Sequence, residues 1–220
     1  LYYIMSLIDL NNYNEGTTIP SLRTETLNRL EFDIPSLVEQ ETILSCLNPI
    51  DEKIALNNAI NNNLEQQAQA LFKSWFVDFE PFDGELPSSW TNEKLGNVCN
   101  CVLGGTPSRA KPEYWNGTIP WINSGEVNNF RIIKPSETIT ELGLTKSATK
   151  LLPLKTTVIA ITGATLGQVS LLEIDACANQ SVVGIIPNDD YPYEYIYPLI
   201  KQSINELTSH QTGGAQQHIN

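Results

Sequence analysis

Histidine and cysteine are scarce in this sequence, and none of them stands in a metal-binding spacing. The 220 residues include 2 histidines and 4 cysteines, with no C-x-x-C pair. These residues are Cys46, Cys99, Cys101, Cys177, His210 and His218. Zinc sites and disulfide frameworks both need regular spacings of such residues. We therefore expect reduced thiols, as in a cytoplasmic protein, and no bound metal.

Long apolar runs are also missing. No stretch approaches the roughly 18 consecutive apolar residues that a membrane-spanning helix needs. The N-terminal residues have no basic segment ahead of an apolar one, so a signal peptide is not expected either. The chain begins at Leu1 instead of a methionine, which suggests that it was cut from a longer polypeptide.

Catalytic motifs are absent as well. Residues 162–167 contain two glycines but lack the lysine of a phosphate-binding loop, and there is no nucleophile elbow or dinucleotide fingerprint. Asp189 and Asp190 lie in a turn-like segment, where a solvated loop is the ordinary interpretation. We expect no enzyme activity and no cofactor. A small hydrolase built on His218 or on these carboxylates is a minor alternative.

Positive charge is in deficit overall, but not in every segment. Thirteen Lys and Arg stand against 25 Asp and Glu, giving a formal net charge of −12, and carboxylates repel a phosphate backbone. The acidic excess lies in residues 1–83, which sum to −9, whereas residues 94–155 sum to +4. The basic residues of the second segment are Lys94, Arg109, Lys111, Arg131, Lys134, Lys146, Lys150 and Lys155. A polyanion would find its surface there.

Helix signals begin at Ser36. Ser36 and Glu39 have the spacing of a capping box, in which each side chain accepts from a backbone N–H of the first turn. Asn48-Pro49 then interrupts the pattern, because proline suits the first position of a new helix and asparagine suits its cap. The pattern predicts two helices in line, or one kinked helix, over residues 36–79.

One face of this helix carries a seam of apolar residues. Ten positions lie alternately four and three residues apart, which is the pattern of a coiled coil. They are Ile43, Leu47, Ile50, Ile54, Asn57, Asn61, Leu64, Ala68, Leu71 and Trp75. The two asparagines would weaken the seam while penalising wrong registers. The alternative is an amphipathic helix packed on its own domain, but a rod of about 57 Å favours the seam.

The remaining residues predict a mixed domain behind a linker. Two prolines and a glycine between residues 76 and 90 indicate the linker, and we place a domain boundary near residue 84. Five short runs predict strands, at residues 98–103, 119–123, 157–162, 168–174 and 181–186, and residues 193–207 predict a final helix. The fold class is α+β: a mixed α/β domain attached to a long coiled-coil-forming helix.

Polar loops in this domain carry groups that both donate and accept hydrogen bonds. The candidate contact residues are Gly105, Thr106, Ser108, Arg109, Lys111, Ser124, Asn179, Gln180, Gln216, Gln217 and His218. Asn and Gln pair with adenine, Arg and Lys with guanine, and hydroxyls and backbone N–H groups with phosphate. Ordinary turns, with a strand cap at Asn179, are an equal alternative. Trp115 and Trp121 are expected in the core and not as stacking platforms.

Three stretches together resemble the specificity subunit of type I restriction-modification systems. They are residues 67–79 (QAQALFKSWFVDF), residues 104–108 with 114–121 (GGTPS and YWNGTIPW), and residues 163–167 with 178–180 (GATLG and ANQ). The resemblance runs almost from end to end of the chain. It adds Gly163 and Thr165 to the candidate DNA contacts.

The resemblance implies a function and a set of partners. The family's subunit has two target recognition domains joined by long antiparallel helices that measure the distance between two DNA half-sites. Its implied partners are double-stranded DNA, a modification subunit that methylates adenine and a restriction subunit. This chain resembles half of that subunit: residues 1–35 the tail of one domain, residues 36–79 the helical spacer and residues 84–220 a recognition domain.

This half size leads to a prediction about assembly. A rod would separate residues 1–35 from residues 84–220, whereas two antiparallel rods bring each tail beside the other chain's domain. We expect an antiparallel homodimer in which residues 17–35 complete the partner's domain, with a palindromic split site. The competing interpretation is a coiled-coil assembly module whose globular part binds another protein.

Overall fold

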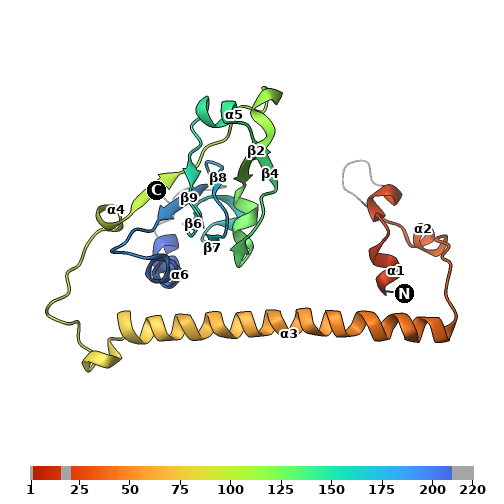
Figure 1. Cartoon of the computed structure of the whole chain (residues 1–220), viewed down its shortest axis with the longest axis horizontal. Helices are drawn as coiled ribbons and strands as arrows, with labels where there is room; N and C mark the ends of the chain where they lie inside the picture. The colour runs from red at the N-terminus through yellow and green to blue at the C-terminus, as the bar shows by residue number, and fades with distance from the viewer. Residues whose placement is uncertain (1, 16–20, 210–220) are drawn as a thin grey trace. The chain divides into compact units, whose positions relative to one another are not determined.

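The computed structural model describes residues 2–15 and 21–209 of the chain. Contacts among the residues divide it into two units, Leu1–Asn62 and Asn63–Asn220. One long helix, α3 (Leu37–Phe76), begins in the first unit and ends in the second (Figure 1).

The first turn of α3 is closed by the predicted capping box. The elements before it are α1 (Tyr2–Ser6), η1 (Leu10–Tyr13) and α2 (Thr24–Asn28). The Ser36 N–H donates to Glu39 Oε2 at 2.9 Å, and the Glu39 N–H donates to Ser36 Oγ at 3.4 Å. Hydrogen bonds from the side chain and backbone of Ser36 lower the pKa of Glu39. The capping box is therefore confirmed.

The helix continues without interruption to Phe76. Its 40 residues include Pro49 in the interior, so the expectation of two helices in line is wrong. A proline removes one backbone hydrogen bond from a helix and crowds the preceding turn. The turns on both sides of Pro49 are nevertheless helical, so the proline interrupts one bond and does not end the element.

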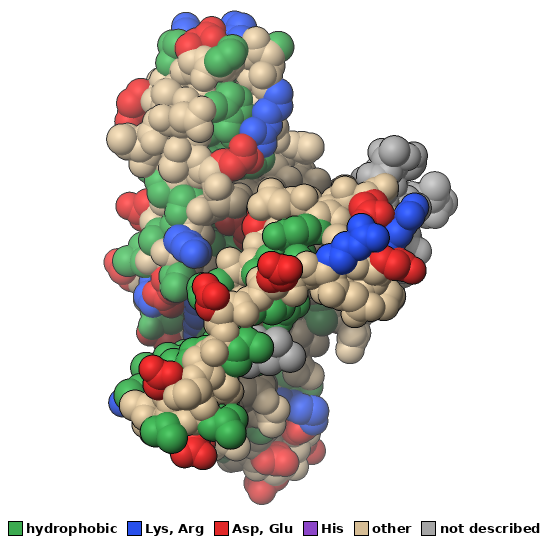
Figure 2. All heavy atoms as spheres, turned by 90° about the vertical axis from the view of Figure 1, so that its right-hand side faces the viewer, with side chains coloured by type: hydrophobic (Ala, Val, Ile, Leu, Met, Phe, Trp, Pro, Cys, Tyr) green, Lys and Arg blue, Asp and Glu red, His purple; other side chains and the backbone are tan. Residues whose placement is uncertain are grey.

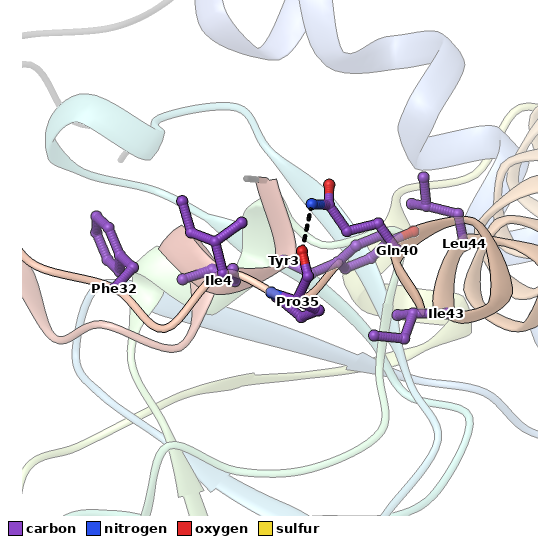
Figure 3. Close-up of a pocket in the computed structure, with 8 residues that line it drawn as sticks. Tyr3, Ile4, Phe32, Pro35, Gln40, Ile43 and Leu44 are labelled. Atoms are coloured by element: carbon purple, nitrogen blue, oxygen red, sulfur yellow. Dashed lines mark hydrogen bonds between the residues drawn. The ribbon is translucent and has the colours of Figure 1, made fainter. Parts of the chain in front are cut away.

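Residues of the first unit form an apolar hollow beside the first turns of α3. The hollow has a volume of 360 Å³ and is lined by Tyr3, Ile4, Phe32, Ile34, Pro35, Gln40, Ile43 and Leu44. Figure 3 shows these side chains around it, with Gln40 Nε2 donating to the Pro35 carbonyl at 2.8 Å. The Tyr3 hydroxyl donates to Asp51, and this bond raises the pKa of Tyr3 to about 12. These contacts attach α1 to the first half of α3.

The second unit contains most of the regular structure. Its strands are β1 (Asn100–Leu103), β2 (Trp115–Ile122), β3 (Arg131–Ile132), β4 (Glu137–Ile139), β5 (Leu151–Leu152), β6 (Thr157–Ala160), β7 (Val169–Leu172), β8 (Ala176–Ala178) and β9 (Val182–Ile186). Its helices are α4 (Leu95–Val98), α5 (Glu141–Thr145) and α6 (Tyr193–Ser209), with 3-10 turns η2 (Glu80–Phe82), η3 (Pro112–Tyr114), η4 (Ser124–Asn128) and η5 (Gly163–Thr165).

Two sheets form the centre of this unit. One has the order β1-β9-β6-β7-β3 and the other the order β4-β2-β8-β5. The five predicted strands correspond to β1, β2, β6, β7 and β9, and the predicted final helix to α6, so the α+β class is confirmed. The strands that the sequence did not reveal, β3, β4, β5 and β8, are two or three residues long. Such strands are too short to show alternation.

The apolar core lies on both faces of the five-stranded sheet. Val158 and Ala160 of β6 point toward the second sheet, where they pack with Ile122 of β2. Ile159 points the other way and packs with Ile196 of α6. This alternation is the period of two that a strand imposes. The result is a layered unit with α6 on one side of two stacked sheets.

The last turns of α3 are anchored to α6 by aromatic side chains. Phe72 is 5% exposed, and its ring centroid lies 5.5 Å from that of Tyr195, while Phe76 lies 5.2 Å from the same ring. Most of the predicted seam lies on a neighbouring, exposed face, although Ile43 lines the hollow of the first unit and Trp75 packs edge to face on Phe82 at 6.4 Å. The seam residues Ile43, Ile50, Ile54, Leu64, Leu71 and Trp75 are 44% to 62% exposed. The alternative of a helix packed on its own domain thus describes the Phe72 face, not the seam.

We predict that the Phe72 face contributes to the stability of the single chain. Phe72→Ala should lower the free energy of unfolding by about 3–5 kcal/mol, the usual cost of removing a buried aromatic ring. Leu56→Ala is the matched control, because Leu56 is 59% exposed on the same helix and lies outside the seam. Such a surface change should stay within about 0.5 kcal/mol. Denaturant unfolding followed by tryptophan fluorescence measures both, and equal effects would contradict this assignment.

Candidate nucleic-acid interface

Four strands end at one edge of the two sheets. β1 and β6 both run antiparallel to β9 and end beside its first residues, while β2 and β8 run parallel. The turn after β8, residues 179–181, lies among these ends. The Asn179 N–H donates to the Ile122 carbonyl at 3.0 Å, and the Ile161 N–H donates to the Ser181 carbonyl at 2.9 Å. The loops that follow these strands therefore meet around this turn.

A pair of glycines allows the loop after β1 to approach this turn. A Cβ on Gly104 would lie 2.1 Å from the Asn179 carbonyl oxygen, and one on Gly105 would lie 2.6 Å from the Thr149 nitrogen. Only glycine fits such close approach. Gly105 is buried, its N–H donates to the Ala178 carbonyl, and its own carbonyl accepts from Trp121 Nε1 at 3.1 Å. Gly105 is therefore a packing position, and its expected role as a contact stays a prediction.

The structure brings other candidate residues together at the surface. The Thr106 hydroxyl donates to Oε1 of Gln180 across 74 positions of sequence, and both side chains are exposed. Asn179 Oδ1 instead accepts from the Ser181 N–H at 3.0 Å. The strand-cap alternative therefore applies to Asn179, whereas Thr106 and Gln180 form a polar pair on the outer side of the turn.

Arg109 is held in place by a carboxylate and two indole rings. Its Nη1 and Nη2 lie 2.5 and 2.7 Å from the two oxygens of Glu137 on β4, and its Cζ lies 3.6 Å from the Trp115 ring centroid. The hydrogen bonds raise the pKa of Arg109 and lower that of Glu137. Because its planar fork is already occupied, Arg109 fixes the loop on the four-stranded sheet. Direct reading of a base would require displacement of Glu137.

The two indole rings belong to the core, as expected. Trp121 is 2% exposed and Trp115 is 9% exposed. Their centroids lie 5.1 Å apart in an edge-to-face arrangement, on the outer face of the four-stranded sheet with Ile139. The Trp115 ring packs against the Arg109 guanidinium, and neither indole ring has a free face on which a base could stack.

Ser124 is presented by a capped turn. The Asn123 N–H donates to Glu126 Oε2 at 2.8 Å, the Ser136 N–H donates to Glu126 Oε1 at 2.8 Å, and Asn123 Oδ1 accepts from the Gly125 N–H. Glu126 thus holds η4 and the Ser136 loop together. The Asn-x-x-Glu spacing is a capping-box signal, so this structural role of Glu126 was detectable from sequence.

The remaining candidates of the described chain lie on the turns η4 and η5 and on the loop between β1 and η3. η4 contacts η5, so Ser124 lies near the turn that contains Gly163 and Thr165. Gly163 is exposed, with φ +73° and open space around its Cα. Lys111 is exposed, and its Nζ lies 3.0 Å from the Tyr114 hydroxyl. Ser108 lies one position before Arg109, and its carbonyl accepts from Trp115 Nε1 at 3.3 Å.

Two lysines lie beside this site, and the sequence analysis did not include them among the candidate contacts. Thr149 is 1% exposed, and its hydroxyl donates to the Ala178 carbonyl at 3.2 Å, so it packs between the glycine pair and the end of β8. Lys146 and Lys150 flank Thr149 in sequence, and both are exposed. They were counted only as charges, because the contact that places them here joins residues far apart in the chain.

Electrostatics divide the basic residues of this unit into two sets. Arg109 pairs with Glu137, and Arg131 and Lys155 both lie near Glu173, at 3.9 and 2.5 Å. The described cations of this unit without an ion pair are Lys94, Lys111, Lys134, Lys146, Lys150 and Lys201. On the face drawn in Figure 2, basic and acidic side chains are interspersed.

Three of the candidate contact residues and part of the tail are not among the described residues. Gln216, Gln217 and His218 fall outside the described residues, as do residues 17–20 of the tail. Within residues 2–15 and 21–209, no helix is long and apolar enough to cross a membrane. The same residues contain no group of three or more His, Cys, Asp or Glu placed to hold a metal ion.

Comparisons with known proteins agree on one family. The model of the family described as type I restriction modification DNA specificity domain matches residues 1–66 and 87–220. The chain is 30% identical to the MjaIX specificity subunit of Methanocaldococcus jannaschii, over 76% of this chain and 42% of that protein. It is 26% identical to the HindI specificity subunit of Haemophilus influenzae, over 84% of this chain and 55% of that protein. The chain thus spans about half the length of these relatives.

Solved structures show the same fold. The S subunit of a type I restriction-modification system from M. genitalium matches with a TM-score of 0.53 and 20% identity, over 90% of this chain and 50% of that one. The HsdS subunit from Thermoanaerobacter tengcongensis matches with a TM-score of 0.50 and 17% identity, over 95% of this chain and 53% of that one.

We predict that Arg109 and Glu137 are energetically coupled, and that the coupling depends on pH. A double-mutant cycle with Arg109→Ala and Glu137→Gln should give about 0.5–1 kcal/mol at neutral pH, the range of partly exposed pairs. A carboxyl group whose pKa is lowered on folding stabilises above its ordinary pKa, and this stability is lost as the pH falls through the lowered value. The coupling should therefore vanish in acid.

The control for this cycle replaces the carboxylate with another one nearby. Glu141 is exposed in the first turn of α5, so Arg109→Ala with Glu141→Gln should show additive effects at every pH. Denaturant unfolding across the pH range measures both cycles. Coupling that persists in acid would mean that the interaction between Arg109 and Glu137 does not depend on the charge of the carboxylate.

Proposed function

The chain belongs to the type I restriction-modification DNA specificity family, and from this premise we propose that residues 84–220 read a DNA sequence for such a system. The observation that carries the proposal is the meeting of four strand ends at one edge, with exposed hydroxyl, amide and lysine groups around a rigid turn. Loops held on a rigid scaffold are the usual place for binding residues. The chain itself is a recognition subunit and needs no cofactor.

Different side chains at this edge suit contacts with bases and contacts with phosphates. Amide and hydroxyl groups such as those of Thr106, Gln180 and Ser124 donate and accept hydrogen bonds, which suits them to base edges. Lys111, Lys146 and Lys150 supply positive charge for phosphates, which position a protein on the duplex. Methylation of adenine and cleavage belong to partner subunits, a modification subunit and a restriction subunit. We also propose that the protein works in the cytoplasm together with these partners.

The acidic segment also has a role in this proposal. Residues 1–83 carry a net charge of −9, whereas residues 94–155 carry +4. A carboxylate-rich surface repels the phosphate backbone, so DNA is directed to the basic segment. The acidic segment then faces protein partners, including a second copy of this chain.

We propose an antiparallel homodimer as the unit that reads DNA. Its spacer is the helix of residues 36–79, and residues 17–35 of each chain complete the recognition domain of the other. The proposal is supported by the exposed seam of α3, because apolar stripes of this length on a monomer usually mark an interface. A two-fold dimer would read a palindromic split site.

An assembly module without DNA binding is the competing function. It would use the same seam, and the net charge of −12 favours it. The family membership and the cluster of lysines near the turn favour DNA. Only DNA binding releases counterions, so only that function predicts an affinity that falls steeply with salt.

We predict that Lys146 and Lys150 contact phosphate in the assembled complex. The double variant Lys146→Ala/Lys150→Ala should weaken binding to all duplexes alike. It should also reduce the slope of log K against log salt by up to about 1.8, at about 0.9 for each lost contact. Lys94→Ala is the control, because Lys94 is exposed and precedes the opposite end of β1. Fluorescence anisotropy over a salt series measures all three proteins. Equal slopes for the two variants would remove the lysines from the interface.

We predict that the full chain sediments as a dimer at micromolar concentration. Sedimentation velocity over a dilution series should show twice the mass of one chain, with monomer appearing only at lower concentration. A stable monomer throughout the micromolar range would contradict the homodimer. Selection from random duplexes by the assembled complex would then show whether the site is palindromic, as two-fold symmetry requires.

A further inference from the structure

The seam of α3 is symmetric in its own sequence. Each of its ten positions lies as far before Ala59 as another lies after it. The symmetric pairs are Ile43 with Trp75, Leu47 with Leu71, Ile50 with Ala68, Ile54 with Leu64 and Asn57 with Asn61. Apolar residues therefore correspond to apolar residues, and the only two polar residues correspond to each other.

This symmetry has a direct structural meaning. When two copies of a helix pack antiparallel about a two-fold axis, a residue that lies before the axis on one chain faces the residue equally far after it on the other. The seam alternates spacings of four and three, so every such pair joins an a-type position to a d-type position. Those are the positions whose side chains fill the interface of a coiled coil.

We propose that α3 binds α3 of a second copy in the antiparallel register that places the two-fold axis at Ala59, so that Asn57 of each chain pairs with the partner's Asn61. This inference rests on the proposed homodimer and names its interface and register. The interface has a polar centre of two Asn–Asn layers, flanked on each side by apolar layers. Each asparagine amide both donates and accepts, so the two amides of a layer can hydrogen-bond to each other.

The apolar layers fit in size as well as in kind. The small Ala68 faces the partner's larger Ile50, and such alternation fills an interface without overpacking. A hollow of 300 Å³ lies at this end of the seam, lined by Ala68, Leu71, Phe72, Trp75 and Phe76 of α3 and by Glu194 and Pro198 of α6. Leu71 and Trp75 are 62% and 45% exposed beside it. The partner's Leu47 and Ile50 would enter this hollow.

The asparagines exclude neighbouring antiparallel registers. A slip by one heptad places Asn57 opposite the partner's Ile54 and Asn61 opposite the partner's Ile50. Symmetry repeats both mismatches, so four layers then bury an amide against isoleucine. Each unsatisfied buried amide costs about 1–3 kcal/mol, so the slipped register is strongly disfavoured.

Charge favours the antiparallel direction over the parallel one. Before Ala59 the helix carries four carboxylates and one lysine, namely Glu39, Glu41, Asp51, Glu52 and Lys53. After Ala59 it carries only Glu65 and Lys73. A parallel pair would set two acidic halves side by side, and like charges across an interface are unfavourable. The antiparallel pair sets each acidic half beside a neutral half.

The test of this register replaces each asparagine by leucine in the full chain. In the proposed register, Asn57→Leu leaves the partner's Asn61 facing leucine in both central layers, and Asn61→Leu does the same to Asn57. Each single variant should therefore dimerise at least about tenfold more weakly than the parent chain. The double variant has two apolar layers and should dimerise more tightly than either single variant. Asn62→Leu is the matched control, because Asn62 is exposed one position outside the seam.

The sign of the single-variant effect decides the register. In a parallel dimer Asn57 would face its own copy, so each single variant would replace a polar layer by a leucine layer and tighten the dimer. Tightening by either single variant would overturn the proposal. The proposal would also be overturned if the two single variants and the double variant all dimerised as strongly as the parent chain, because the dimer would then use another surface. A monomeric parent chain would refute the homodimer itself, and with it the proposed assembly.

Cysteine cross-linking gives an independent measurement. In a background of Cys46→Ser and Cys101→Ser, which removes the exposed thiols, a Leu47→Cys chain should link to a Leu71→Cys chain when the two are mixed. Neither variant should link to itself, because its two copies lie about 36 Å apart along the interface at about 1.5 Å per residue. Self-linking of either variant would indicate a parallel dimer and overturn the proposal.

Discussion

The organisation of this protein depends on a helix with two apolar faces, of which its own chain covers one. Phe72 and Phe76 pack against Tyr195 of α6, whereas Leu71 and Trp75, on the adjacent face, are 62% and 45% exposed. A residue three or four positions away lies on the same face of a helix and a neighbouring residue does not. The chain therefore fixes the end of α3 to α6 by one stripe, and the other stripe is the surface that we propose as the dimer interface.

The recognition edge follows a different principle, in which polar groups bind one another before they bind a ligand. Glu126 closes η4, Glu137 holds Arg109, and the Thr106 hydroxyl donates to Gln180. Such bonds reduce the freedom of the loops, and a loop that is already ordered loses less entropy on binding. The lysines around the edge remain without carboxylate partners among the described residues, which leaves their charge available to phosphate.

Local patterns predicted the elements, and long-range contacts decided the site. The capping box at Ser36, the strands of residues 157–162 and 181–186 and the final helix were visible in sequence because each depends on neighbours in the chain. The partner of Arg109 was not visible, since Glu137 is 28 positions away. The packing role of Gly105 and the position of Lys150 were equally hidden, because both depend on contacts with Thr149 and the end of β8. No spacing rule could supply those contacts.

The asparagines at the centre of α3 illustrate how a chain can trade stability for a unique arrangement. Two leucines there would bury more apolar surface, but a uniformly apolar seam would accept several registers and both directions. An amide layer is satisfied only when it meets another amide, so it makes every other antiparallel alignment less stable than the correct one. The acidic first half of the helix then disfavours the parallel direction, which the amides alone would tolerate. In the proposed dimer, the two features together would set the distance between the recognition domains of two copies, and a reader of a split site must hold that distance constant.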